Sequence, residues 1–110
     1  MNATRNVIID CDPGIDDSLA LLLALNSPEL NVVGITIVCG NVPTHIGAQN
    51  ALKVLDLVDR LDIPVYLGAN RPLKVDYVSA QDTHGDDGLG NSQLPEVTAV
   101  GPAQNAARFI

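Results

Sequence analysis

Residues 7–25 read VIIDCDPGIDDSLALLLAL, in which a short apolar run, an acidic turn and a longer apolar run follow one another. The β-branched run at 7–9 is typical of a buried parallel strand. Residues 18–25 predict a helix that is apolar on nearly all sides, and it should stop before Pro28, because the residue before a proline disfavours helical backbone. This order of strand, turn and helix predicts the first half of a β-α-β unit.

The chain continues with the same alternation. Residues 32–38, VVGITIV, predict a second strand, and residues 63–68, IPVYLG, predict a third. Between them, the apolar positions of residues 44–61 recur at helical spacing, and Thr44 is a plausible N-cap for that helix. We therefore predict an α/β fold, with an open, mostly parallel, Rossmann-like sheet and flanking helices.

The last third of the chain has a weaker pattern. Residues 69–97 are rich in Gly, Pro, Asp and Asn and predict a long loop, and Pro102 could open a helix over 102–110. Three parallel strands alone would leave sheet edges uncovered. We therefore expect residues 1–110 to be the N-terminal part of a single larger domain.

Composition narrows the choice of partners. The chain has a formal net charge of −7, which disfavours binding to nucleic acid or to an anionic membrane. The longest apolar run, at 19–25, is far shorter than the roughly 20 residues that cross a bilayer. Cys11 and Cys39 are the only cysteines, and we expect both to be buried free thiols in a cytoplasmic protein.

The turn DCDPGIDD raises an electrostatic question, because it holds Asp10, Asp12, Asp16 and Asp17 within eight positions. Two like charges about 4 Å apart repel by about 4 kcal/mol at an effective dielectric constant near 20. A helix N-terminus, worth about 0.3–1 kcal/mol, accounts for an acid at the helix start but not for Asp10 and Asp12 converging on one crevice. A divalent cation accounts for the convergence of Asp10 and Asp12 as well, since hard cations bind carboxylate oxygens. The turn thus indicates either a metal site or a capped, solvated turn.

A D-x-D turn is also found in some phosphotransferases and phosphatases. In such phosphotransferases or phosphatases the first aspartate is the nucleophile and the second is the acid. Here Pro13 and Gly14 stand where a small hydroxyl residue would be expected. This alternative stays open, as does a non-catalytic remnant of the fold.

The stretch IIDCDPGIDDSLAL resembles the signature turn of the inosine-uridine-preferring nucleoside hydrolases. The resemblance continues along nearly the whole chain, in VVGITIVCGN (32–41), NALKVLDL (50–57), IPVYLGANRPL (63–73) and THGDDGLG (83–90). It implies cleavage of the N-glycosidic bond of a small-molecule ribonucleoside, giving ribose and free base, with one bound Ca²⁺. Separately, exposed sheet edges favour self-association, so we expect the full-length protein to be a homo-oligomer.

The resemblance implies a role for several individual residues. Asp12 would be both a calcium ligand and the general base that activates the attacking water, and Asp17 would be a second calcium ligand. Asp10 matches an acidic position with a supporting role. The remaining calcium ligands and any acid that assists the leaving base would lie beyond residue 110, so we expect the isolated chain to be inactive.

Three further residues would contact the substrate. Asp16 would bind a ribose hydroxyl, Asn41 would line the pocket near the ribose and the attacking water, and His84 would lie near the substrate. Without the resemblance, Asn41 is an ordinary turn residue after a glycine and His84 an ordinary loop histidine.

Overall fold

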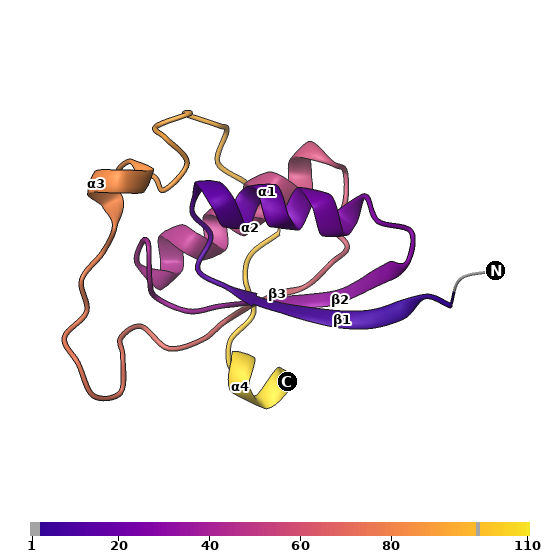
Figure 1. Ribbon diagram of the computed structural model, residues 1–110, viewed down its shortest axis with the longest axis horizontal. Helices are drawn as coiled ribbons and strands as arrows, with labels where there is room; N and C mark the ends of the chain where they lie inside the picture. Colours follow the sequence, from indigo (N-terminus) through magenta and orange to yellow (C-terminus); the bar gives the residue numbers. More distant parts are fainter. Residues whose placement is uncertain (1–2, 99) are drawn as a thin grey trace.

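The computed structural model describes residues 3–98 and 100–110 and contains strands and helices in the predicted alternation (Figure 1). Two short helices follow the β-α-β-α-β unit. The elements are β1 (Arg5–Cys11), α1 (Ile15–Leu25), β2 (Leu30–Ile37), α2 (Thr44–Leu57), β3 (Val65–Leu67), α3 (Gln81–His84) and α4 (Ala106–Phe109).

The three strands form one parallel sheet in the order β1-β2-β3, which confirms the predicted sheet. Asp10 of β1 lies opposite Thr36 of β2, and Thr36 lies opposite Tyr66 of β3. The register shifts once between β1 and β2, at Val7/Ile8. Because the strands are parallel, the turns that follow β1 and β2 lie at the same edge of the sheet.

Helices α1 and α2 cover one face of the sheet, and α4 lies on the opposite face (Figure 1). The apolar positions of α1, α2 and the strands meet in one core, which confirms the helical spacing seen in the sequence. Its largest fully buried apolar side chains are Leu21, Ile35, Ile37, Leu52, Leu55 and Val42.

The opposite face is covered more lightly. Phe109 of α4 stacks on Tyr66, with ring centroids 4.0 Å apart, and lies over Gly34. Residues 102–104 do not begin the helix predicted from Pro102. Instead, Ala103 bonds to β3 through Val65 and Leu67, so this segment starts to extend the sheet before α4 begins at Ala106.

Helix α2 ends at Leu57, four residues before the predicted end. Asp59 has a positive φ of 57°, and the amide of Arg60 reaches back to the carbonyl of Leu55. This closes the helix with the six-to-one hydrogen bond of a Schellman motif, in which glycine is the usual left-handed residue. Thr44 is the first helical residue and Pro43 is the N-cap; the Thr44 hydroxyl caps no helical amide and donates instead to the carbonyl of Ala69.

Other expectations need smaller corrections. Helix α1 begins at Ile15, at the acidic turn itself, and the long loop contains the short helix α3. Cys11 and Cys39 are free thiols as expected, but both are half-buried. Across residues 3–98 and 100–110, none of the helices has the length and apolar character needed to cross a bilayer.

Candidate active site

The acidic turn lies between the end of β1 and the start of α1, at the carboxyl edge of the sheet. Ligands of open α/β sheets bind outside this edge. The segment that follows β2 lies beside the turn, because the amide of Val38 donates to the carbonyl of Cys11. Polar residues from the ends of two adjacent strands therefore come together.

Asp12 is held at three points. Its Oδ2 accepts a hydrogen bond from the backbone amide of Asn41 at 2.9 Å, and its carbonyl accepts one from Asn41 Nδ2 at 3.1 Å. Its own amide donates to Oδ2 of Asp17 at 3.1 Å. The structure therefore brings together Asp12, Asp17 and Asn41, and it fixes the direction in which the Asp12 carboxylate points.

Two glycines make this arrangement possible. A Cβ on Gly40 would overlap the Asp12 carboxylate, so only glycine leaves room for that side chain. A Cβ on Gly14 would lie 2.5 Å from Nδ1 of His84 and 3.0 Å from Nδ2 of Asn41. The close contacts explain why glycine stands at both positions.

Negative charge is concentrated around Asp17. Burial, followed by contact with the Asp12 carboxylate, raises the pKa of Asp17 from 3.8 to about 6, although the Asp12 amide works in the opposite direction. Burial and the charges of Asp17, Asp10 and Asp12 raise the pKa of the adjacent Cys11 thiol to about 12. Cys11 is therefore a protonated thiol at neutral pH and no nucleophile.

Asp10 and Asp16 lie outside the group held by Asn41. Oδ1 of Asp10 accepts a hydrogen bond of 2.6 Å from the buried hydroxyl of Thr36, which ties Asp10 to β2. Asp16 is exposed in the first turn of α1, where the helix dipole stabilises negative charge. Asp16 is thus free to reach a ligand at the rim of the turn.

His84 joins the turn from far along the chain. It is the last residue of α3, and its Nδ1 accepts a hydrogen bond of 3.1 Å from the amide of Ile15, the first residue of α1. A ring nitrogen that accepts in this way carries no proton, so the proton of the neutral ring is on Nε2. The structure therefore places His84 against the acidic turn.

Several contributors to this site carry no clear sequence signal. The Tyr77 hydroxyl donates to the carbonyl of Gly40 at 3.0 Å, and the amide of Ala80 donates to the carbonyl of Asn41 at 2.8 Å. Both bonds hold the segment before α3 against the residues that follow β2. The two partners of each bond lie nearly forty residues apart in the sequence, so no local pattern predicts the contact.

The donor set suits a hard cation in part. Asp12 and Asp17 offer carboxylate oxygens, the ligand type that calcium prefers, and each carries a charge that a cation would balance. Over residues 3–98 and 100–110, no group of three or more acidic, histidine or cysteine side chains could hold a metal ion. Calcium takes six to eight oxygens, so these two residues would supply only part of its shell.

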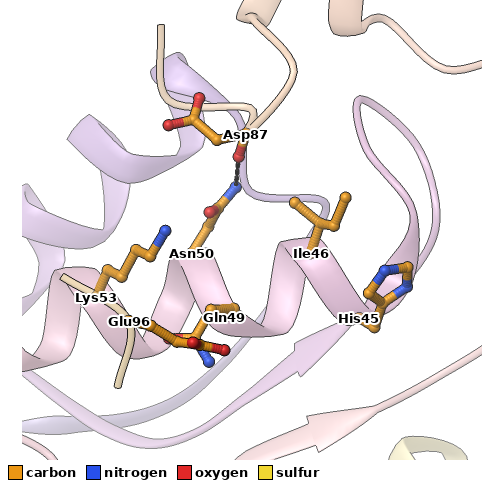
Figure 2. A pocket seen from close by; sticks show the side chains of 7 residues that line it. All are labelled: His45, Ile46, Gln49, Asn50, Lys53, Asp87 and Glu96. Carbon is orange, nitrogen blue, oxygen red and sulfur yellow. Dashed lines mark hydrogen bonds between the residues drawn. The ribbon is translucent and has the colours of Figure 1, made fainter. Parts of the chain in front are cut away.

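A cavity of about 430 Å³ lies along α2, and Figure 2 shows the side chains around it. It contains none of the site residues predicted from the sequence. The carboxylates at the sheet edge, rather than this cavity, therefore mark the candidate active site. The lining residues are His45, Ile46, Gln49, Asn50, Lys53, Asp87 and Glu96.

Comparison with known proteins gives a consistent match. The family model described as inosine-uridine preferring nucleoside hydrolase matches residues 7–110. A pyrimidine-specific ribonucleoside hydrolase of Photobacterium profundum is 47% identical over 93 residues, which cover 84% of this chain and 30% of that protein. A probable uridine nucleosidase of Arabidopsis thaliana is 46% identical over 93 residues, covering 83% of this chain and 29% of that protein.

A solved structure agrees. The purine-preferring ribonucleoside hydrolase from Gardnerella vaginalis superposes with a TM-score of 0.87 and 34% sequence identity, over 96% of this chain and 34% of that one. The chain thus spans about a third of the length of the relatives it matches.

Proposed function

This chain belongs to the inosine-uridine preferring nucleoside hydrolase family, and from that membership we propose that the whole protein cleaves the N-glycosidic bond of ribonucleosides. We also propose that residues 1–110 form the first part of a single hydrolase domain in a cytoplasmic protein. The family match favours this reaction over the phosphotransferase alternative. The observation that carries the mechanism is the Asp12 carboxylate, which Asn41 and the close approach of Gly40 hold in one direction.

In the proposed reaction, Asp12 is the general base. It takes a proton from a water molecule, whose oxygen bonds to C1′ of the ribose. The bond between C1′ and the nitrogen of the leaving nucleobase breaks, its electron pair stays on the nucleobase, and the nucleobase gains a proton. A carboxylate held within hydrogen-bond reach contributes about 10²–10⁴-fold to such a step. The fixed orientation of the Asp12 carboxylate supports this role, because a general base must point at the water before it can take the proton.

The other residues would bind and orient the sugar. Positive charge grows on the ribose ring in an oxocarbenium-like transition state, and the neighbouring carboxylates stabilise it. Asp16, exposed at the rim, would bind a ribose hydroxyl, and Asn41 would face the ribose and the water. Nε2 of His84 would donate toward the substrate, since Nδ1 is engaged by the Ile15 amide.

We propose Ca²⁺ as the cofactor, with Asp12 and Asp17 as two of its ligands and Asp10 as a supporting acid. The chemistry that calcium supplies when bound is a fixed positive charge, which eases deprotonation of water and anchors hydroxyl groups. The carboxylate donor set supports this choice. The remaining oxygens would come from water, substrate hydroxyls or other parts of the whole protein.

The proposal predicts a contrast between the whole protein and the chain described here. The whole protein should release ribose from a panel that contains both inosine and uridine, measured as reducing sugar. The purified 110-residue chain should release none above background, because it carries only part of the calcium site. Ribose release by the short chain would contradict this division of the site, and a whole protein inactive on every ribonucleoside would support a non-catalytic remnant.

A further inference from the structure

Asn50 occupies an unusual place for a polar side chain. It lies in the middle of α2 and is only 1% exposed, at the wall of the cavity that runs along this helix. Its Nδ2 donates to the carbonyl of Pro13 at 3.1 Å and to the carbonyl of Asp87 at 2.7 Å, the second of which Figure 2 draws as a dashed line. One side chain thus bridges the acidic turn and the glycine-rich segment around Asp87.

The orientation of this amide follows from its partners. Both are carbonyl oxygens, so the amino group must face them, and a flipped amide would oppose oxygen to oxygen. The amide oxygen, Oδ1, is buried with no hydrogen-bond partner in the described part of the chain. A buried amide with an unsatisfied oxygen calls for an explanation. We seek it in the two carbonyls that the amino group of Asn50 holds in place.

The segment that Asn50 holds is a compact loop over residues 81–91. Gly85, Gly88 and Gly90 have positive φ, and Oδ1 of Asp87 accepts from the amides of Leu89 and Asn91. A Cβ on Gly88 would lie 2.8 Å from Asn50 Nδ2, so the loop passes directly against that amide. Bonds within the loop give it a shape but leave its position to outside contacts.

Beyond the bond from Ala80 to Asn41 just before the loop, two hydrogen bonds in the described part of the chain tie residues 81–91 to other elements. One is the hydrogen bond from the Ile15 amide to His84, and the other is the bond from Asn50 to Asp87. Both lead to the acidic turn, because Ile15 starts α1 and Asn50 also holds Pro13. Movement of the loop away from Asn50 would therefore draw His84 away from the turn.

We propose that Asn50 is a positioning residue that holds the 81–91 loop against the acidic turn and thereby keeps His84 at the amide of Ile15. It touches no substrate. Whether Asn50 positions His84 can be tested in this chain by structural measurements, without an activity assay. Its effect on turnover rests on the proposed nucleoside hydrolysis.

The test compares two variants by NMR in the 110-residue chain. Asn50→Leu removes the bridge at similar volume. Gln49→Leu is the matched control, because Gln49 is the neighbouring residue of α2 and holds Val97 by two hydrogen bonds of its own, at 3.2 and 2.6 Å. The readouts are hydrogen exchange at the Ile15 amide, which donates to His84 Nδ1, and the ¹⁵N shift of that nitrogen.

With Asn50→Leu, we expect exchange at the Ile15 amide to accelerate at least tenfold and the Nδ1 signal to move away from its hydrogen-bonded value. Gln49→Leu should leave both readouts unchanged. Unaltered readouts in Asn50→Leu, or the same changes in Gln49→Leu, would overturn the proposal. A merely structural loss would affect both variants alike.

If Asn50→Leu does not fold, the unsubstituted chain still decides the matter. Both Nδ2 protons of Asn50 should exchange slowly and show couplings across their hydrogen bonds to the carbonyl carbons of Pro13 and Asp87. Fast exchange without these couplings would overturn the bridge. If the NMR result holds while the whole protein hydrolyses no ribonucleoside, the proposed function fails and the positioning role stands.

Discussion

Replacing Asp12 with asparagine in the whole protein is expected to lower kcat for ribonucleoside hydrolysis by about 10²–10⁴-fold. Asparagine has nearly the same shape, and its side-chain oxygen can still accept the hydrogen bond from the Asn41 amide. The variant should therefore fold normally. It loses the ability to take a proton from water, and it offers calcium a weaker, neutral ligand. Steady-state kinetics on inosine and uridine measure the loss.

The control for this variant is Asp56→Asn. Asp56 is an exposed acid on α2, outside the candidate site, so its replacement removes the same charge without touching the turn. Its kinetics should match those of the unsubstituted protein. A kcat of Asp12→Asn within a few-fold of normal would contradict the role of Asp12 as general base.

The second large effect is expected at Gly40. Gly40→Ala forces a methyl group into the space of the Asp12 carboxylate, which is itself held by the Asn41 amide. Overpacking of this kind costs about 1–3 kcal/mol of unfolding free energy. Since the chain has no tryptophan, urea unfolding followed by circular dichroism is the appropriate measurement. The displaced carboxylate should also weaken the hydrogen bond at the Asn41 amide, which its exchange rate reports.

Gly101→Ala is the matched control for Gly40→Ala. An added Cβ at Gly101 meets nothing within 4 Å, so the unfolding free energy should change by no more than about 0.5 kcal/mol. Equal stability of the two variants would show that the space beside Gly40 is not constrained by Asp12.

The sequence was sufficient to predict the sheet and the two main helices. Apolar strands such as 32–38 and the 3.6-residue spacing in α2 depend on burial, which a local pattern reveals. The end of α2 was predicted wrongly because Asp59, rather than a glycine, adopts the left-handed conformation there. The helix predicted from Pro102 was also wrong, because Ala103 pairs with β3, a long-range contact without a local signal.

The candidate site divides in the same way. Asp12 and Asp17 lie five residues apart, so the turn itself brings them together, and Asn41 follows from the shared edge of parallel strands. The contact between His84 and Ile15 spans 69 residues, and the bridge of Asn50 spans 37 on each side. Such contacts depend on how the loop packs against the core, and no short stretch of the sequence predicts that packing. Their catalytic and binding roles stay predictions.

Ribose release by the whole protein with and without calcium tests directly whether Asp12 and Asp17 hold a cation that the reaction needs. The protein is treated with a chelator, assayed on inosine and uridine, and assayed again after Ca²⁺ is restored. We expect release to stop on chelation and to return with Ca²⁺, and we expect Asp12→Ala together with Asp17→Ala to abolish the recovery. Release that persists after complete removal of the metal would contradict this expectation.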